Sequence, residues 1–331
     1  MSNRVAILNG AKAAAKLHQE LGTKEIIETN RRGNIDVFGA IMSRSVMLVF
    51  RPLDGLLGAF VDGQGVIIST NRPLPVQRFI GAHELGHVVM RHNNSLDFEE
   101  ILNCQSMAQS DHTEIEADSF AGEFLVPRWL LTYHAKRQGW VRDSMNNPAL
   151  VYQLSLRVGA SYEATTRALE RYKIIDRQCR DRLLETTRKT IKEQLVQGYS
   201  PAHWFRDVWL ITEKDEGGFL EGQRDDIFLF RLNENVGAGY LWDFDMLRSS
   251  GFATLSDGRL QESGDANVGA GATRMLLADS PVQKKGELHL ALRRPWQALA
   301  LPADRLNIAY DMRGKEIGLP RAKRPEMVAA A

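Results

Sequence analysis

The chain has 331 residues, of which 44% are hydrophobic, so it is long enough for more than one packed core. Its 42 basic and 41 acidic residues nearly cancel, which argues against a strong nonspecific hold on nucleic acid or on a membrane surface. No run reaches the ~18 apolar residues of a membrane span and two cysteines make no disulfide framework, so we expect a soluble, cytoplasmic protein.

The N-terminal residues show the pattern of a small α+β unit. Residues 11–21 repeat apolar side chains with the period of an amphipathic helix, and residues 35–42 are a second candidate helix. Residues 46–50, 58–61 and 66–69 indicate strands, and the Asp-Gly-Gln-Gly segment between the last two predicts a hairpin turn. A short sheet ahead of the next helix would offer an extended peptide an edge with which to pair.

The segment His83-Glu84-Leu85-Gly86-His87 is an HExxH motif in a strongly apolar stretch. Residues four apart lie on one face of an α-helix, so both imidazoles can reach one metal ion. Glu84 then lies beside the metal, where it can take a proton from a zinc-bound water and hand it to a departing amine. The motif therefore predicts a zinc peptidase with His83 and His87 as ligands and Glu84 as the catalytic base.

A catalytic zinc needs a third protein ligand. The pattern HExxHxxGxxH would require Gly at position 90 and His at position 93, but the chain has Met90 and Asn93. His92 is one position away and would point away from the metal on a continuing helix, so we interpret it as a solvated histidine. Cys104 is either a small loop or buried residue, or a ligand that keeps the metal latent.

Residues 113–127 predict a second helix that ends near Pro127. Glu114 and Asp118 share one of its faces, so Glu114 can bind zinc while Asp118 accepts the other ring N–H of a ligating histidine. Glu116 lies about 200° round the helix, so it can replace Glu114 only if the helix is rotated. An acidic helix start would explain these carboxylates if the two histidines were absent.

Together these motifs resemble the ImmA/IrrE family of zinc metallopeptidases. The resemblance rests on HELGH and on the pattern E-x-E-A-D-x-F-A-x-x-F-L-x-P, and it extends over about residues 1–176. It implies a small thermolysin-like fold in which His83, His87 and Glu114 bind Zn²⁺ and Glu84 is catalytic. It also implies that the substrate is a helix-turn-helix transcriptional repressor, whose cleavage derepresses stress-response or mobile-element genes.

Residues 150–172 have the pattern of a helix-turn-helix, with Gly159 in the turn and Ser161 as the cap of the second helix. DNA binding is one interpretation of this segment. The second helix, however, carries two glutamates beside Arg167 and Arg171, so its charge is mixed rather than a basic stripe. The resemblance to the ImmA/IrrE family instead implies a helical extension that packs beside the peptidase.

From residue 199 onward glycines become frequent, and β-branched and aromatic stretches alternate with turns. Short strands at this spacing predict an antiparallel β-sandwich. The predicted strands are residues 208–212, 227–232, 241–247, 253–255, 273–278 and 287–293.

Three loops of this region resemble those of the chagasin-like inhibitors of papain-type cysteine peptidases. They contain Gly239-Tyr240-x-Trp242, Val268-Gly269-Ala270-Gly271 and Arg293-Arg294-Pro295-Trp296. The resemblance implies an immunoglobulin-like sandwich whose loops wedge into a peptidase cleft. It makes these residues candidate partner contacts: Asn235, Tyr240, Gly269, Gly271, Arg294 and Trp296. The first loop departs from the inhibitors, because Asn-Val-Gly-Ala-Gly at 235–239 lacks both threonines of their Asn-Pro-Thr-Thr-Gly.

We therefore expect a multidomain chain. Residues 1–140 form an α+β, zincin-like metallopeptidase domain, residues 141–198 a helix-turn-helix-like extension and connector, and residues 199–331 an all-β, immunoglobulin-like sandwich. The expected function is an intracellular zinc endopeptidase that cleaves one or few partner proteins, plausibly a helix-turn-helix repressor, with the sandwich as a recognition or regulatory module. The alternatives are an inhibitor of a papain-like cysteine peptidase and a DNA-binding regulator, although neither a membrane nor a nucleic-acid partner is favoured.

Overall fold

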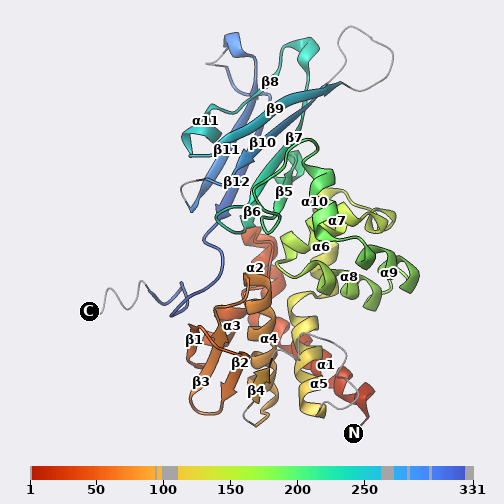
Figure 1. Ribbon diagram of the computed structural model, residues 1–331, viewed down its shortest axis with the longest axis vertical. Helices are drawn as coiled ribbons and strands as arrows, with labels where there is room; N and C mark the ends of the chain where they lie inside the picture. Colours follow the sequence, from red (N-terminus) through yellow and green to blue (C-terminus); the bar gives the residue numbers. More distant parts are fainter. Residues whose placement is uncertain are drawn as a thin grey trace.

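The computed structural model describes residues 2–93, 95–98, 111–261, 272–281, 284–297 and 300–324. Figure 1 shows an elongated molecule with helices and one sheet at the N-terminal end, a helical layer in the middle and two sheets at the other end. The mixed N-terminal region and the β-rich C-terminal region agree with the expected multidomain α+β architecture. None of the described helices is long and apolar enough to cross a lipid bilayer.

The N-terminal part consists of α1 (Asn3–Leu21), α2 (Thr23–Asn30), α3 (Val37–Met42), β1 (Leu48–Arg51), β2 (Leu56–Val61), β3 (Gly65–Ser69), α4 (Leu74–Met90), β4 (Ser95–Phe98) and α5 (His112–Leu125). Its sheet has the strand order β1-β3-β2-β4. β1 and β3 are parallel, whereas β2 pairs antiparallel with both β3 and β4. The predicted helices, strands and hairpin of this part are therefore present.

The central helix of this part is α4. Residues 81–87 are all buried, because the sheet lies against one side of the helix while α1 and α5 pack on the other (Figure 1). Gly86 allows α5 to approach closely, since a Cβ at this position would lie 3.2 Å from the Cα of Ala117. Side chains of α4 and α5 therefore face each other across a short gap.

The helical layer contains α6 (Arg128–Gln138), η2 (Arg142–Asn146), α7 (Pro148–Val158), α8 (Tyr162–Arg171), α9 (Arg177–Glu185) and α10 (Arg188–Leu195). The predicted turn between α7 and α8 is present: Gly159 is left-handed with a φ of 71°, and the Ser161 hydroxyl accepts the Ala164 amide at 3.1 Å. One hydrophobic core runs from Ala14 in α1 to Ile191 in α10. The layer is thus packed as a continuation of the N-terminal part.

The C-terminal part contains β5 (Val208–Ile211), η3 (Glu213–Asp215), β6 (Gly218–Glu221), β7 (Ile227–Glu234), η4 (Val236–Ala238), β8 (Leu241–Asp243), α11 (Asp245–Ser249), β9 (Thr254–Gln261), β10 (Ala272–Asp279), β11 (Lys285–Arg293), η5 (Pro295–Gln297) and β12 (Asp304–Asp311). Two sheets, ordered β5-β7-β10-β9 and β6-β12-β11-β8, contribute side chains to one shared core.

Three details of this part differ from the sequence prediction. The sandwich is mixed rather than antiparallel, because β5 and β7 are parallel, as are β6 and β12. After β5 the chain forms β6 in the second sheet and then returns to the first sheet as β7. As a result, β5 and β7 run in the same direction. The strand predicted at residues 241–247 ends at Asp243, whose side chain accepts the Asp245 amide at 3.0 Å where α11 starts. The strands β6 and β12 were not predicted.

Buried polar contacts join α7 to β5. Gln153 pairs with this strand as a neighbouring strand would: its Nε2 donates to the Val208 carbonyl at 2.7 Å, and its Oε1 accepts the Leu210 amide at 2.9 Å. Arg157 forms an ion pair with Asp215 at 2.9 Å, and both side chains are almost completely buried. Because a buried charge without its partner is costly, these contacts fix how the sandwich lies on the helical layer.

Beside this interface, His134 of α6 is buried, and its Nε2 donates to the Gly33 carbonyl at 2.6 Å. Burial lowers the pKa of His134 to about 4, with a smaller contribution from the cations Arg157 and Arg137, which outweigh Asp215. The folded protein therefore resists protonation of a histidine that the unfolded chain protonates near pH 6.5.

We expect this histidine to make stability depend on pH. Its contribution is complete above pH 6.5 and is lost as the pH falls toward 4, because only the unfolded chain takes up the proton in that window. The free energy of unfolding should fall by about 3 kcal/mol on this account. Urea unfolding at pH 7 and pH 4.5 measures the loss, and His134→Gln, which can still donate to Gly33, should show less of it. An equal fall in the free energy of unfolding in both proteins would show that His134 is not its cause.

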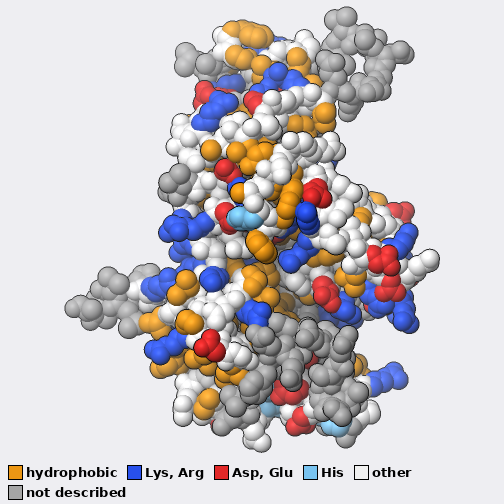
Figure 2. Space-filling model, viewed as in Figure 1, with side chains coloured by type: hydrophobic (Ala, Val, Ile, Leu, Met, Phe, Trp, Pro, Cys, Tyr) orange, Lys and Arg blue, Asp and Glu red, His pale blue; other side chains and the backbone are white. Residues whose placement is uncertain are grey.

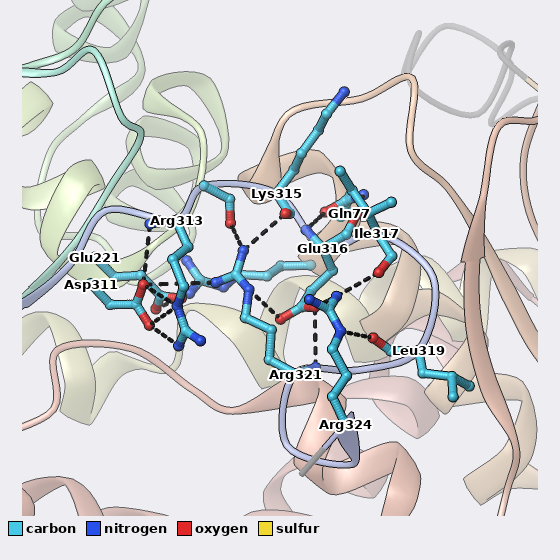
Figure 3. Close-up of polar contacts among 12 residues, drawn as sticks. Gln77, Glu221, Asp311, Arg313, Lys315, Glu316, Ile317, Leu319, Arg321 and Arg324 are labelled. Atoms are coloured by element: carbon cyan, nitrogen blue, oxygen red, sulfur yellow. Dashed lines mark hydrogen bonds and ion pairs between the residues drawn. The ribbon is translucent and has the colours of Figure 1, made fainter. Parts of the chain in front are cut away.

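Residues 312–324, here called the C-terminal strap, leave the sandwich after β12 and run back along the N-terminal part (Figure 3). Gln77 of α4 donates to the Glu316 carbonyl at 3.1 Å and accepts the Glu316 amide at 2.8 Å. Phe50 of β1 and Gly318 exchange two backbone hydrogen bonds of 2.7 and 2.9 Å. The strap therefore contacts both α4 and the sheet beside it.

Ion pairs hold the strap in shape. Glu316 pairs with Arg321 at 3.2 Å and with Arg324 at 3.3 Å (Figure 3). Next to Gln77 on α4, Arg78 pairs with Glu221 at the end of β6, and both side chains are mostly buried. The helix that carries the HExxH motif is thus tied directly to the sandwich and to the strap.

Candidate metal centre

The side chains of His83, His87 and Glu114 converge between α4 and α5. The two Nε2 atoms are 3.0 Å apart, Glu114 Oε2 lies 3.2 Å from His83 Nε2, and Glu114 Oε1 lies 3.7 Å from His87 Nε2. A tetrahedral zinc ion with bonds of about 2.0–2.1 Å would separate its ligand atoms by about 3.3 Å. The donor set and its spacing therefore fit zinc, and the three atoms form a group that can hold a metal ion.

Glu114 lies in the first turn of α5, whose start is capped by the side chain of Asp111. Burial alone would raise the pKa of Glu114, but the hydrogen bonds to His83 and His87 outweigh it and hold this pKa well below its ordinary value. Its position at the positive end of the helix dipole also favours the charged form. The carboxylate is thus ionised and can only accept, as a metal ligand must.

Asp118, one turn further along α5, lies on the other side of His83. Its Oδ1 is 2.9 Å from His83 Nδ1, so the ionised carboxylate accepts the Nδ1 proton. With its proton on Nδ1, His83 would bind a metal through Nε2, which would then lose the proton that it donates to Glu114 in the metal-free site. This is the arrangement that the spacing of Glu114 and Asp118 predicts.

Glu84 is fully buried, and it points from α4 toward the edge of the sheet. The hydroxyl of Ser95, the first residue of β4, donates to Glu84 Oε2 at 2.8 Å. A hydrogen bond from a hydroxyl to a carboxylate fixes the rotation of the carboxylate. Nothing in the sequence pattern singled out Ser95.

The interpretation of His92 as a solvated histidine is wrong. Its side chain is 9% exposed, its Nδ1 lies 3.0 Å from His87 Nδ1, and its Nε2 lies 3.0 Å from Glu116 Oε2. The helix does not continue: α4 ends at Met90, and Arg91 takes a left-handed φ of 58° that turns the chain back. Burial, followed by the neighbouring His87, lowers the pKa of His92. Glu116 thus contacts His92, on the side of α5 away from Glu114.

The four residues His83, Glu84, His87 and Glu114 lie in a region that matches a known peptidase family. Residues 42–170 match the IrrE N-terminal-like domain of the M78 peptidases. The resemblance inferred from the two helix motifs is thereby confirmed, and the IrrE-like region includes α4, α5 and most of α8. The match makes this region similar to a metallopeptidase domain, and it does not extend into the sandwich.

No curated protein sequence matches the chain. Solved structures similar to its C-terminal part include the cysteine protease inhibitor EhICP2 from Entamoeba histolytica, with 22% identity over 34% of this chain and 100% of that chain and a TM-score of 0.29. Another is the solution structure of Amebosin, with 18% identity over 32% of this chain and 96% of that chain and a TM-score of 0.26.

Beyond the IrrE-like region, the described loops at the far end of the sandwich lie together. The guanidinium of Arg294 stacks over the Tyr240 ring at 4.7 Å and donates to the Ala238 carbonyl at 3.0 Å. Trp296 is 70% exposed and lies over Gly239, where a Cβ would come within 2.3 Å of its ring. Figure 2 shows apolar side chains at this end of the molecule.

The other loop predictions have separate outcomes. Trp242 is buried and donates its Nε1 proton to the Asn233 carbonyl at 2.9 Å, so it belongs to the sandwich core. Asn235 is exposed and caps η4 by accepting the Ala238 amide. Gly269, Gly271 and Cys104 lie outside the described residues.

The outward charges of α8 are balanced. Arg167 pairs with Glu163 at 2.8 Å within the helix, and Arg171 pairs with Glu123 of α5 at 3.6 Å. On α7, Gln153 and Arg157 bind the sandwich rather than facing solvent. α7 therefore contacts the sandwich, whereas the outward charges of α8 pair within the helix and with α5.

Proposed function

We propose that the chain is an intracellular zinc endopeptidase in which His83, His87 and Glu114 bind the metal and Glu84 is the general base. The observation that carries this proposal is the convergence of two imidazole nitrogens and one carboxylate at the spacing of zinc ligands. The match of residues 42–170 to the M78 peptidases supports it. Asp118 orients His83, and its carboxylate makes the histidine a stronger ligand.

A zinc ion held by this group would act as a Lewis acid and would lower the pKa of water. Glu84 would take the proton that water loses when it attacks the carbonyl carbon of the scissile peptide bond. The same carboxyl group would then give this proton to the nitrogen of the departing amine. Ser95 keeps the carboxylate in one orientation during both transfers, since it donates to Oε2.

The sheet edge beside Glu84 is suited to an extended protein substrate. β4 is the last strand in the order β1-β3-β2-β4, and its Ser95 contacts Glu84 directly. A peptide that pairs with β4 would use main-chain hydrogen bonds for affinity and would place a peptide bond next to the carboxylate. This mode of binding selects an unfolded or extended segment of a partner protein. The partner that we propose is a helix-turn-helix repressor.

The sandwich and the strap would act on this site through α4. Gln77 and Arg78, two turns before the motif, bind the strap and β6 respectively. A partner that binds the sandwich and shifts these contacts would therefore change the position of α4 relative to α5. We propose on this ground that the sandwich is a recognition or regulatory module.

Co-expression tests the substrate. The full chain and its Glu84→Gln variant should each be expressed with a helix-turn-helix repressor encoded beside the gene, and the repressor examined by mass spectrometry. We expect cleavage at one or few sites with the wild-type chain only, and none after zinc is removed with a chelator. A repressor that stays intact beside the zinc-loaded chain would contradict this choice of substrate.

A second function is suggested by the exposed Trp296, with Arg294 and Tyr240 stacked beside it. An exposed tryptophan beside a half-buried arginine can serve as the anchor of a protein interface. We propose as the alternative that these loops inhibit a papain-like cysteine peptidase. Titration of papain with the full chain should then give micromolar or tighter inhibition that Trp296→Ala removes. Full papain activity at a millimolar concentration of the chain would exclude this inhibitory function.

A further inference from the structure

The end of α4 places a second histidine against one of the proposed zinc ligands. Because Arg91 is left-handed, the His92 amide donates back to the His87 carbonyl at 3.0 Å, and the His92 ring folds onto the side of His87. The two Nδ1 atoms are 3.0 Å apart, and the ring centroids are 5.0 Å apart. The contact with His92 uses Nδ1 of His87, whereas the other ring nitrogen of His87, Nε2, points toward His83.

The hydrogen bonds around His92 determine where its protons lie. Two nitrogens at 3.0 Å cannot both carry a proton toward each other, so one Nδ1 donates and the other accepts. Glu116 accepts from His92 Nε2 at 3.0 Å, because an ionised carboxylate cannot donate. A neutral His92 that donates from Nε2 must accept at Nδ1. His87 therefore donates from Nδ1, and its Nε2 keeps the lone pair that a metal requires.

Glu116 is itself held in place from a third helix. Its Oε1 accepts the side-chain amide of Asn9 on α1 at 2.8 Å, and the residue is 8% exposed. The chain of contacts from His87 through His92 to Glu116 and Asn9 is thus continuous and mostly buried. Glu116 therefore accepts from His92 on one side and from Asn9 on the other.

We propose that His92 is a positioning residue that fixes the metal-binding tautomer of His87, and that Glu116 and Asn9 hold His92 for this role. The inference rests on the proposed function, since it takes His87 as a zinc ligand. His83 and His87 would then be oriented in different ways. The carboxylate of Asp118 contacts His83 directly, whereas the imidazole of His92 lies between His87 and the carboxylate of Glu116. Outer contacts of this kind raise the basicity and fix the direction of a ligand.

The first test measures zinc affinity rather than activity. Metal-free full chain is titrated with zinc in competition with a chromophoric chelator. We expect His92→Phe to weaken binding about 10–100-fold, and Glu116→Gln to weaken it less, because its amide oxygen can still accept from His92. His289→Phe, which replaces an exposed histidine of the sandwich, is the matched control and should bind as the wild type does.

The second test uses the wild-type chain, so it does not require a substituted chain to fold. Nitrogen-15 NMR of the zinc-loaded wild-type chain reports the tautomer of each histidine. We expect the proton of His87 on Nδ1 and that of His92 on Nε2. A proton on Nδ1 of His92, or unchanged zinc affinity in His92→Phe, would overturn the inference, as would a second zinc ion bound by His92. A wild-type chain that binds no zinc would instead remove the proposed function itself.

Discussion

Glu84→Gln should abolish most of the cleavage while zinc binding stays as in the wild type. The carboxamide keeps the shape of the side chain and can still accept the hydroxyl of Ser95, but it cannot take a proton from water. Positioned general acid–base catalysis contributes about 10²–10⁴-fold to rate, so kcat should fall by about this factor. Because Glu84 is not in the group of ligand atoms, the zinc dissociation constant should not change.

The measurement is the cleavage rate of the partner protein with zinc content determined in the same samples. Glu163→Gln, on the outer face of α8, is the matched control and should cleave at the wild-type rate. A Glu84→Gln variant that cleaves within a factor of about three of the wild type would exclude Glu84 as the base. Loss of zinc from this variant would show that the side chain serves the metal instead.

Arg157→Met should strongly destabilise the folded chain without touching the candidate metal centre. The substitution leaves Asp215 buried with its main charge partner removed, and it also removes donors to the Leu210 carbonyl and to Gln153. Breaking a buried ion pair on one side costs about 3–5 kcal/mol, because the remaining charge keeps its desolvation penalty. The contact joins α7 to the sandwich, so the loss should fall on the interface between the two parts.

Urea unfolding followed by tryptophan fluorescence measures this loss, since Arg157 lies 5.7 Å from the centre of the Trp140 ring. The control is Arg167→Met, which breaks an ion pair of similar length that is half exposed. We expect at most about 1 kcal/mol for this surface pair. Equal effects of the two substitutions would contradict the view that the Arg157 contact locks the sandwich in place.

Much of the candidate metal centre was predictable because its geometry depends on helix periodicity. Residues four apart share a face, so the HExxH motif placed His83 and His87 together, and the same rule placed Asp118 above Glu114. The preference for Glu114 over Glu116 also followed from the angle between them. The turn at Gly159 and Ser161 was predictable because each residue type has a specific role at a helix end.

The remaining contacts depend on tertiary structure. Arg91 adopts a left-handed conformation that favours glycine, so no residue pattern indicated that the helix would stop there and bring His92 back. Ser95 reaches Glu84 only because β4 pairs with β2, a contact between segments far apart in the sequence. The strap likewise returns to Gln77 over a separation of 239 residues, which no local pattern encodes.

The most direct test of the account is the zinc stoichiometry of the full chain. Metal-free protein should be titrated with zinc and the bound metal counted by mass spectrometry under native conditions. We expect one bound zinc ion for the wild type and for Glu84→Gln, and none for His87→Ala at the same zinc concentration. A wild-type chain without zinc, or a His87→Ala variant that binds zinc as tightly as the wild type, would contradict it.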